Sequence, residues 1–111
     1  SFADAGGKLI IDHGLDDPLI PVEGTIDYYH RMREIHGGQN FIDQFCRLYI
    51  NPGDGHGNCH TNGPGMTEST GIQALMNWVE QNKAPENLPA VLVNQKTGKT
   101  IRKGIVKPWR V

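Results

Sequence analysis

Apolar and polar positions follow two kinds of pattern in the first 50 residues. Residues Lys8–Asp12 hold a continuous apolar run, which is typical of a short strand buried on both faces. In Phe45–Ile50 apolar positions alternate along the chain, which predicts a second strand with one firmly apolar face. Between these runs, apolar side chains recur every three residues over Ile26–Ile35, which predicts a helix capped by Thr25.

Proline, glycine and asparagine mark the connections. Two prolines predict that residues 13–24 are not helical, and Gly37-Gly38 are expected to end the first helix. Residues 51–67 form a loop rich in glycine, asparagine and threonine. This loop is longer than ordinary connections, and long loops without regular structure often carry function.

The sequence pattern after residue 67 predicts a second helix followed by a hairpin. Ser69 or Thr70 is expected to cap this second helix, and Asn82 follows its end. Weaker strand patterns at residues 90–93 and 100–106 flank a glycine-containing turn, which predicts a terminal hairpin. The helix carries an apolar stripe at the spacing i, i+3, i+4 and i+7, formed by Ile72, Leu75, Met76 and Val79.

A strand, helix and strand of these lengths predict an α/β fold with two parallel strands and a right-handed crossover. Parallel strands bring their C-terminal ends to one edge of the sheet, where open α/β sheets place their sites. Asp17 comes five residues after the first strand, and His56 comes six residues after the second. We therefore predict that the Asp17 carboxylate lies about 2.6–3.2 Å from the His56 imidazole.

This pair predicts a specific chemistry. A carboxylate that fixes the tautomer of an imidazole supplies two thirds of a nucleophile–base–orienter triad. The order Asp17 then His56 matches the α/β-hydrolases, in which the nucleophilic serine comes first.

Other interpretations of the same residues are open at this point. Asp16 competes with Asp17 for the orienting role, and both loops could be ordinary surface turns. His13 is expected to shape its loop, while His30 and His36 are expected on a solvated helix face. His56, Cys59 and His60 could bind a metal with Asp16 or His13, although their spacing fits no standard zinc pattern. A non-catalytic interaction fragment is a further alternative.

Composition narrows the classes of protein. The 111 residues fit at most one domain, and the formal net charge is −1. Basic residues cluster only at Lys99–Lys107, without interleaved aromatic residues, so we expect no nucleic-acid partner. No apolar run reaches the roughly 18 residues of a membrane span. Two cysteines form no disulfide framework, and Cys46 is expected to be a buried thiol.

Several short motifs, taken together and in order, resemble the C-terminal part of the tannase and feruloyl esterase family. The resemblance covers nearly the whole chain and implies an α/β-hydrolase that cleaves esters of gallic or hydroxycinnamic acids, without a cofactor. The matching motifs are Gly6-Gly7-Lys8-Leu9-Ile10, His13-Gly14-Leu15-Asp16-Asp17-Pro18-Leu19-Ile20-Pro21, Tyr28-Tyr29, Arg47-Leu48-Tyr49, Pro52-Gly53-Asp54-Gly55-His56, Gly63-Pro64-Gly65, Trp78-Val79-Glu80 and Ala84-Pro85-Glu86.

The resemblance also implies roles for single residues. The family's triad Asp lies in the His-Gly-x-x-Asp-Pro stretch, here Asp17, and its triad His follows the Pro-Gly turn, here His56. Family members often carry a cysteine directly after this His, bridged to a cysteine beside the serine. Here two residues intervene before Cys59, which could still serve that bridge. A secreted or periplasmic location is also implied.

The family's nucleophile elbow and lid have no counterpart in these residues. The two serines, Ser1 and Ser69, stand outside any Gly-x-Ser-x-Gly frame. We therefore expect residues 1–111 to be the C-terminal βαβ-plus-helix portion of an α/β-hydrolase sheet, with a possible terminal hairpin. As a separate chain it is expected to be inactive, and to self-associate or to need the rest of its protein.

Overall fold

A computed structural model describes residues 1–57 and 63–110 as a mixed α/β fold with two small sheets. β1 and β2 pair in parallel, with Leu9 opposite Cys46 and Gly14 opposite Asn51, while β3 and β4 form an antiparallel hairpin. The elements are β1 (Leu9–Gly14), α1 (Val22–Ile35), α2 (Gln39–Ile42), β2 (Cys46–Asn51), α3 (Glu68–Gln81), β3 (Leu88–Val93) and β4 (Thr100–Val106). The predicted parallel pair and terminal hairpin are both confirmed.

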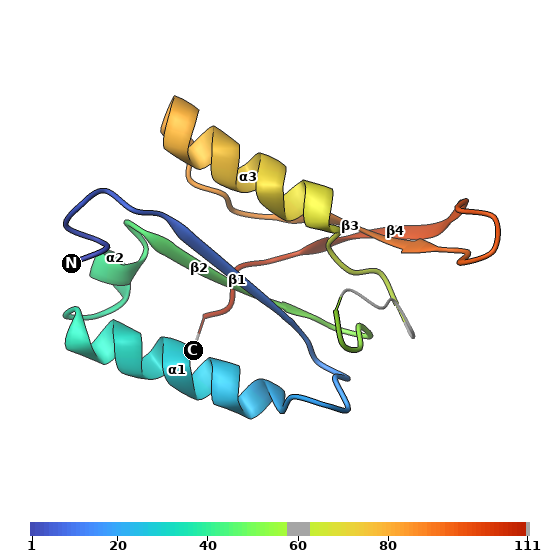
Figure 1. Ribbon diagram of the computed structural model, residues 1–111, viewed down its shortest axis with the longest axis horizontal. Coiled ribbons are helices and arrows are strands. Elements are labelled where there is room, and N and C mark those ends of the chain that lie inside the picture. The colour runs from blue at the N-terminus through green and yellow to red at the C-terminus, as the bar shows by residue number, and fades with distance from the viewer. Residues whose placement is uncertain (58–62, 111) are drawn as a thin grey trace.

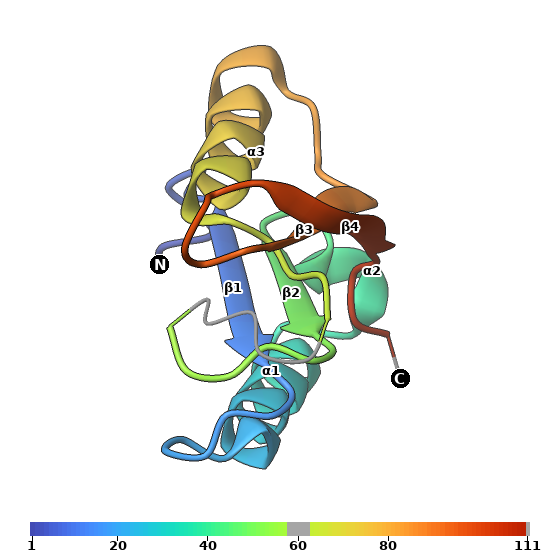
Figure 2. The same ribbon diagram turned by 90° about the vertical axis from the view of Figure 1, so that its right-hand side faces the viewer.

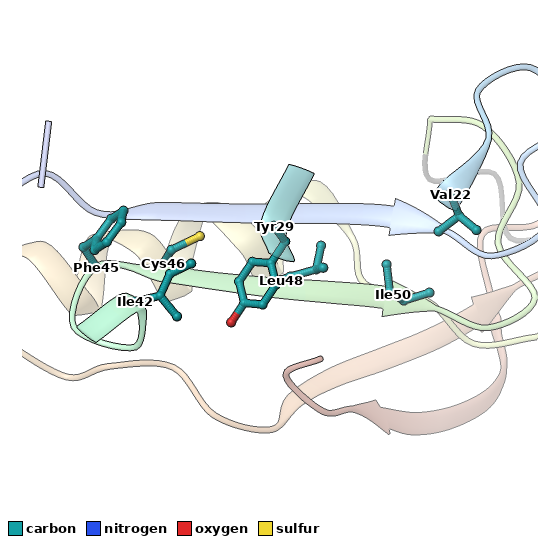
Figure 3. Close-up of a cluster of buried hydrophobic side chains, with 7 residues drawn as sticks. All are labelled: Val22, Tyr29, Ile42, Phe45, Cys46, Leu48 and Ile50. Carbon is teal, nitrogen blue, oxygen red and sulfur yellow. The ribbon is translucent and has the colours of Figure 1, made fainter. Parts of the chain in front are cut away.

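The β1–β2 pair lies between two layers. α1 covers one face, and α3 lies with the hairpin on the other (Figures 1 and 2). β2 is buried along its whole length, because its alternating side chains enter two different clusters. The cluster beneath α1 contains Val22, Tyr29, Ile42, Phe45, Cys46, Leu48 and Ile50 (Figure 3), and the cluster beneath α3 contains Tyr49, Met66, Ala74, Leu88, Ala90 and Val106.

Both long helices begin differently from the sequence prediction. α1 begins at Val22, with Pro21 as its N-cap, so residues 22–24 are helical. Proline is compatible with this position, because its fixed φ suits a helix start and no N–H is needed there. At α3 the cap is Thr67, whose hydroxyl oxygen accepts the amide hydrogen of Thr70, so the caps proposed at residues 69 and 70 were wrong.

The apolar stripe of α3 does not form its buried face. The buried residues of this helix are Ala74 and Trp78, whereas Ile72, Met76 and Val79 are 60%, 45% and 62% exposed. An amphipathic helix that exposes its main apolar stripe presents surface suited to contact with another part of a protein.

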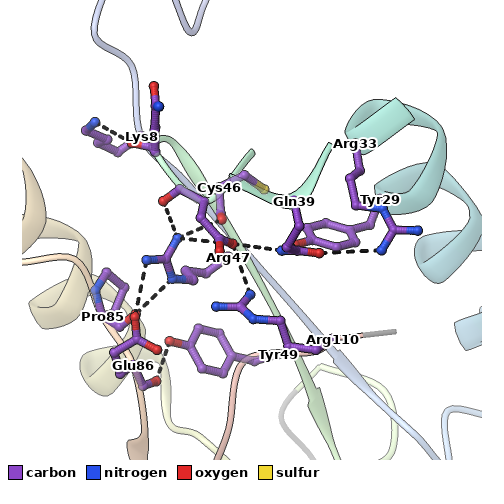
Figure 4. Close-up of polar contacts among 12 residues, drawn as sticks. Lys8, Tyr29, Arg33, Gln39, Cys46, Arg47, Tyr49, Pro85, Glu86 and Arg110 are labelled. Carbon is purple, nitrogen blue, oxygen red and sulfur yellow. Dashed lines mark hydrogen bonds and ion pairs between the residues drawn. The ribbon is translucent and has the colours of Figure 1, made fainter. Parts of the chain in front are cut away.

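Arg47 ties β2 to the connection between α3 and β3 (Figure 4). Its Nε donates to the carbonyl oxygen of Pro85 at 2.9 Å, and its guanidinium lies 5.0 Å from the ring centre of Trp78. The Tyr49 hydroxyl donates to the Glu86 carbonyl at 2.7 Å. These contacts tie β2 to the segment that joins α3 to β3.

Cys46 is buried as predicted, and burial raises the pKa of its thiol to about 12. Cys59 lies outside the described residues, so its bridge stays a prediction. No helix among the described residues is both long and apolar enough to cross a bilayer.

Candidate active site

Two loops leave the C-terminal edge of the parallel pair and are joined by backbone hydrogen bonds. The amide of Leu15 donates to the carbonyl of Asn51 at 3.0 Å, and the amide of Asp16 donates to the carbonyl of Asp54 at 2.9 Å. These bonds continue the pairing of β1 and β2 beyond the strands. The loop after β1 and the loop after β2 are therefore held side by side.

Gly14 allows this close approach. A Cβ at this position would lie 2.3 Å from the carbonyl oxygen of Gly55 and 2.5 Å from that of Asp54. Backbone atoms cannot yield as a flexible side chain would, so only glycine fits between strand and loop. The glycine thereby sets the distance between the end of β1 and His56.

Asp17 and His56 meet across the two loops. Nδ1 of His56 lies 3.0 Å from Oδ2 of Asp17. The Asp17 side chain is 5% exposed, whereas that of His56 is 51% exposed. The predicted proximity of the two groups is thus confirmed. A hollow of about 210 Å³ beside them is lined by Asp12, His13, Gly14, Asp17, Ile20, His56 and Gly57.

The Asp17 carboxylate is held by its own loop. Its Oδ1 accepts the amide hydrogens of Leu19 at 2.8 Å and Ile20 at 2.9 Å. Removal from water raises the pKa of Asp17, but the Ile20 amide, His56 and the Leu19 amide together outweigh this effect. The pKa therefore falls from 3.8 to about 2, and the group is a carboxylate at neutral pH.

Asp16, the competing carboxylate, is exposed in the loop after β1. Of the two neighbouring acids, the structure brings Asp17 to the imidazole. His30 and His36 are half-buried rather than solvated, because His30 contacts Arg33 and His36 stacks on Phe41 at 5.6 Å.

His13 has a closer relation to the site than the sequence indicated. Its Nε2 lies 3.3 Å from Oδ2 of Asp17, the same oxygen that faces His56. The strand extends through His13 to Gly14, so alternation along β1 places His13 on the face turned to α1. Ile11 packs against the cluster beneath α1, so the alternation of side chains along the strand could have predicted that His13 lies on the same face.

The metal interpretation has no counterpart in the described part of the chain. Among residues 1–57 and 63–110, no three His, Cys, Asp or Glu side chains gather closely enough to hold a metal ion. Cys59 and His60, two of the ligands considered, lie outside these ranges.

The depressed pKa of Asp17 predicts a pH-dependent stability. A carboxylate whose folded pKa of about 2 lies below its usual 3.8 stabilises the fold above pH 4, and this contribution is lost as the pH falls towards 2. We expect Asp17→Asn to flatten the pH dependence of the urea midpoint between pH 4 and 2. The exposed Asp27→Asn serves as the matched control. Parallel curves for Asp17→Asn and the unchanged chain would contradict this prediction.

Comparison with known proteins places this geometry in context. The family model described as "Tannase and feruloyl esterase" matches residues 1–109. A probable feruloyl esterase from Arthroderma benhamiae is 36% identical over 86 residues, which cover 78% of this chain and 16% of that protein. A mono(2-hydroxyethyl) terephthalate hydrolase from Piscinibacter sakaiensis is 36% identical over 90 residues, covering 81% of this chain and 14% of the relative.

Solved structures show the same fold. An esterase from Aspergillus oryzae superposes with a TM-score of 0.87 at 24% identity, over 97% of this chain and 24% of that one. A tannin acyl hydrolase from Aspergillus niger gives a TM-score of 0.80 at 29% identity, over 97% of this chain and 21% of that one. The chain therefore spans about a fifth or less of the curated relatives named here.

Proposed function

Because the chain belongs to the tannase and feruloyl esterase family of carboxylic-ester hydrolases, we propose that it supplies the base and orienting carboxylate of a serine esterase. The observation that carries this proposal is the 3.0 Å contact between His56 Nδ1 and Asp17 Oδ2. The carboxylate can only accept there, so the proton of neutral His56 resides on Nδ1. The lone pair of Nε2 is then available as a general base.

The proposed reaction uses these two groups twice. As a serine oxygen attacks the ester carbonyl, His56 takes the serine proton, and Asp17 stabilises the imidazolium. His56 then gives this proton to the departing alcohol, leaving an acyl-enzyme. In the second half, His56 takes a proton from water as the water oxygen attacks the acyl group, and returns it to the serine when the acid leaves.

The nucleophile in this proposal comes from the rest of the same protein. Both serines of the chain are engaged elsewhere, Ser1 with Asp4 at 2.8 Å and Ser69 with Thr67 at 3.0 Å. We therefore assign residues 1–111 to the C-terminal part of an α/β-hydrolase catalytic domain. The feruloyl esterase and tannin acyl hydrolase among the similar proteins support an aromatic ester of a gallate or hydroxycinnamate type as substrate. A secreted or periplasmic location stays a prediction.

Exposed apolar surfaces support this assignment. β1 pairs only with β2 among the described strands, and an apolar hollow of about 500 Å³ runs between β1 and α1 past Leu9, Tyr28 and Met32. Together with the exposed stripe of α3, this leaves apolar surface on both sides of the β1 edge. A further strand with its covering helices would fill these positions.

We expect the 111-residue chain to show no hydrolysis of methyl gallate or methyl ferulate. It offers a base and its orienter, but the nucleophile and the oxyanion hole carry the covalent step. Product release measured by chromatography would test this, with the complete protein as the positive control. The proposed function requires that the complete protein hydrolyse such an ester and that His56→Ala abolish turnover. Turnover by the chain alone that is lost in His56→Ala would reveal a nucleophile within these residues.

The separate chain is also expected to self-associate. An unpaired strand edge flanked by apolar side chains recruits other chains, and a small core gives little margin against such exposure. Light scattering over a concentration series should show a rising mean mass. Ile72→Lys together with Val79→Lys should reduce this rise, because both side chains are exposed. A cooperative monomer at high concentration would contradict the assignment to a fragment.

A further inference from the structure

His13 connects three parts of the fold at the candidate site. Its side chain is only 10% exposed. Nδ1 lies 2.8 Å from the hydroxyl oxygen of Thr25 on α1, and Nε2 lies 2.9 Å from the carbonyl oxygen of Ile20 in the loop after β1. The same Nε2 lies 3.3 Å from Oδ2 of Asp17. A single imidazole thus links strand, helix and loop.

These partners define the protonation of the His13 ring. The carbonyl oxygen of Ile20 and the carboxylate of Asp17 can only accept, so the hydrogen must reside on Nε2. The Thr25 hydroxyl can donate to Nδ1, which leaves the ring neutral. His13 therefore holds the opposite tautomer to His56, whose hydrogen faces Asp17 from Nδ1.

We propose that His13 is a positioning residue that keeps the Asp17 carboxylate aimed at His56. This inference rests on the proposed function of the Asp17–His56 pair. The Nε2–H of His13 donates to the Ile20 carbonyl at 2.9 Å, and the amide of the same Ile20 donates to Oδ1 of Asp17, so His13 fixes the loop that holds the carboxylate. The same Nε2 lies 3.3 Å from Oδ2. His13 moves no proton in the reaction. It acts by holding the acceptor that sets the tautomer of His56.

The hydrogen bonds of Asp17 show why this support matters. Oδ1 accepts two backbone amides, whereas Oδ2 has one hydrogen-bond partner among the described residues, His56, and the ring of His13 lies beside it at 3.3 Å. Without His13, the loop loses the bond that ties the Ile20 carbonyl to β1, and Oδ2 loses the imidazole nitrogen that lies 3.3 Å away. The carboxylate would then rotate among several directions, and His56 would populate both neutral tautomers.

The first test measures the tautomer of His56 in the complete protein, because the separate chain is expected to self-associate. Nitrogen-15 NMR of the histidine rings, in mildly alkaline buffer and dilute solution, distinguishes a hydrogen on Nδ1 from one on Nε2. We expect His56 to carry it on Nδ1, and His13→Ala to shift the spectrum towards a mixture. His13→Gln retains an N–H donor and should restore part of the Nδ1 form. His30→Gln, which removes a histidine that contacts Arg33 on α1, is the control and should change nothing at His56.

Thr25→Val provides a second variant that retains His13. It removes the hydroxyl that lies 2.8 Å from Nδ1 and helps to hold the His13 ring, and should shift the His56 spectrum in the same direction by a smaller amount. If His13→Ala does not fold, Thr25→Val decides the outcome. An unchanged His56 spectrum in the folded variant would overturn the proposal, even where thermal stability falls, because a merely structural role would affect stability alone.

Kinetics of the complete enzyme distinguish a failure of this inference from a failure of the proposed function. We expect His13→Ala to lower kcat by roughly 10–100-fold, which is the loss typical of residues that orient the ligands of a metal without binding the metal themselves. KM should stay within about twofold. A kcat within twofold of the unchanged enzyme would overturn the positioning role. If instead His56→Ala retains full turnover while the NMR response to His13→Ala is present, the proposed function alone fails.

Discussion

Asp17→Asn is expected to lower kcat of the complete enzyme by about 10⁴-fold, the effect of the same change in a serine protease triad. An asparagine of the same shape retains an oxygen for the amides of Leu19 and Ile20. Its NH₂ group, however, would face Nδ1 of His56 as a donor. The imidazole then carries its hydrogen on Nε2 and has no lone pair for the nucleophile.

Steady-state kinetics with methyl ferulate measures this effect. We expect KM to change little, because the Asp17 side chain is 5% exposed and its carboxylate is turned to His56. Asp16→Asn is the matched control, since it removes the adjacent carboxylate and should stay within about threefold of the unchanged enzyme. A loss below roughly tenfold for Asp17→Asn, or a larger loss for Asp16→Asn, would move the orienting role away from Asp17.

Gly14→Ala is expected to reduce both stability and activity. The added methyl group would lie 2.3 Å from the Gly55 carbonyl oxygen, so the loop that carries His56 must move away from β1. Overpacking of this kind costs about 1–3 kcal/mol of stability. A displacement of about 1 Å at a catalytic group lowers activity by about 10²-fold, which we expect for kcat of the complete enzyme.

Gly24→Ala is the control for this substitution. Gly24 lies in the first turn of α1, and a Cβ there would meet no atom within 4 Å. Alanine also favours a helix over glycine by about 1 kcal/mol, so this variant should be as stable as the unchanged chain or more stable. Chemical unfolding and kcat should therefore separate the two glycines. Equal behaviour of the two variants would contradict the role assigned to Gly14.

The sequence was sufficient to predict the parts of the site that depend on chain direction. Alternation in Phe45–Ile50 and the apolar run at Lys8–Asp12 predicted two strands, and a helix between them predicted that they are parallel. Parallel strands end at one edge, so the meeting of Asp17 and His56 followed without knowledge of any side-chain contact.

The predictions that failed depend on packing partners outside the local pattern. The stripe on α3 correctly indicated a helix, but periodicity does not reveal which element covers which face, and Trp78 rather than Ile72 is buried. The contacts of His13 require the placement of Thr25 on α1 and of the Ile20 carbonyl. Pro21 was taken to exclude a helix, although it precedes the first helical residue.

Asp17 and His56 lie 39 positions apart along the chain, and this separation has a consequence for folding kinetics. The β3–β4 hairpin closes over a short turn and can form from local contacts, whereas β1 and β2 meet only after the intervening chain has become ordered. Parallel pairing between distant segments is slow, because the entropy of loop closure is lost before the contacts form. We expect the Asp17–His56 contact to appear late during folding, together with the parallel pair that carries it.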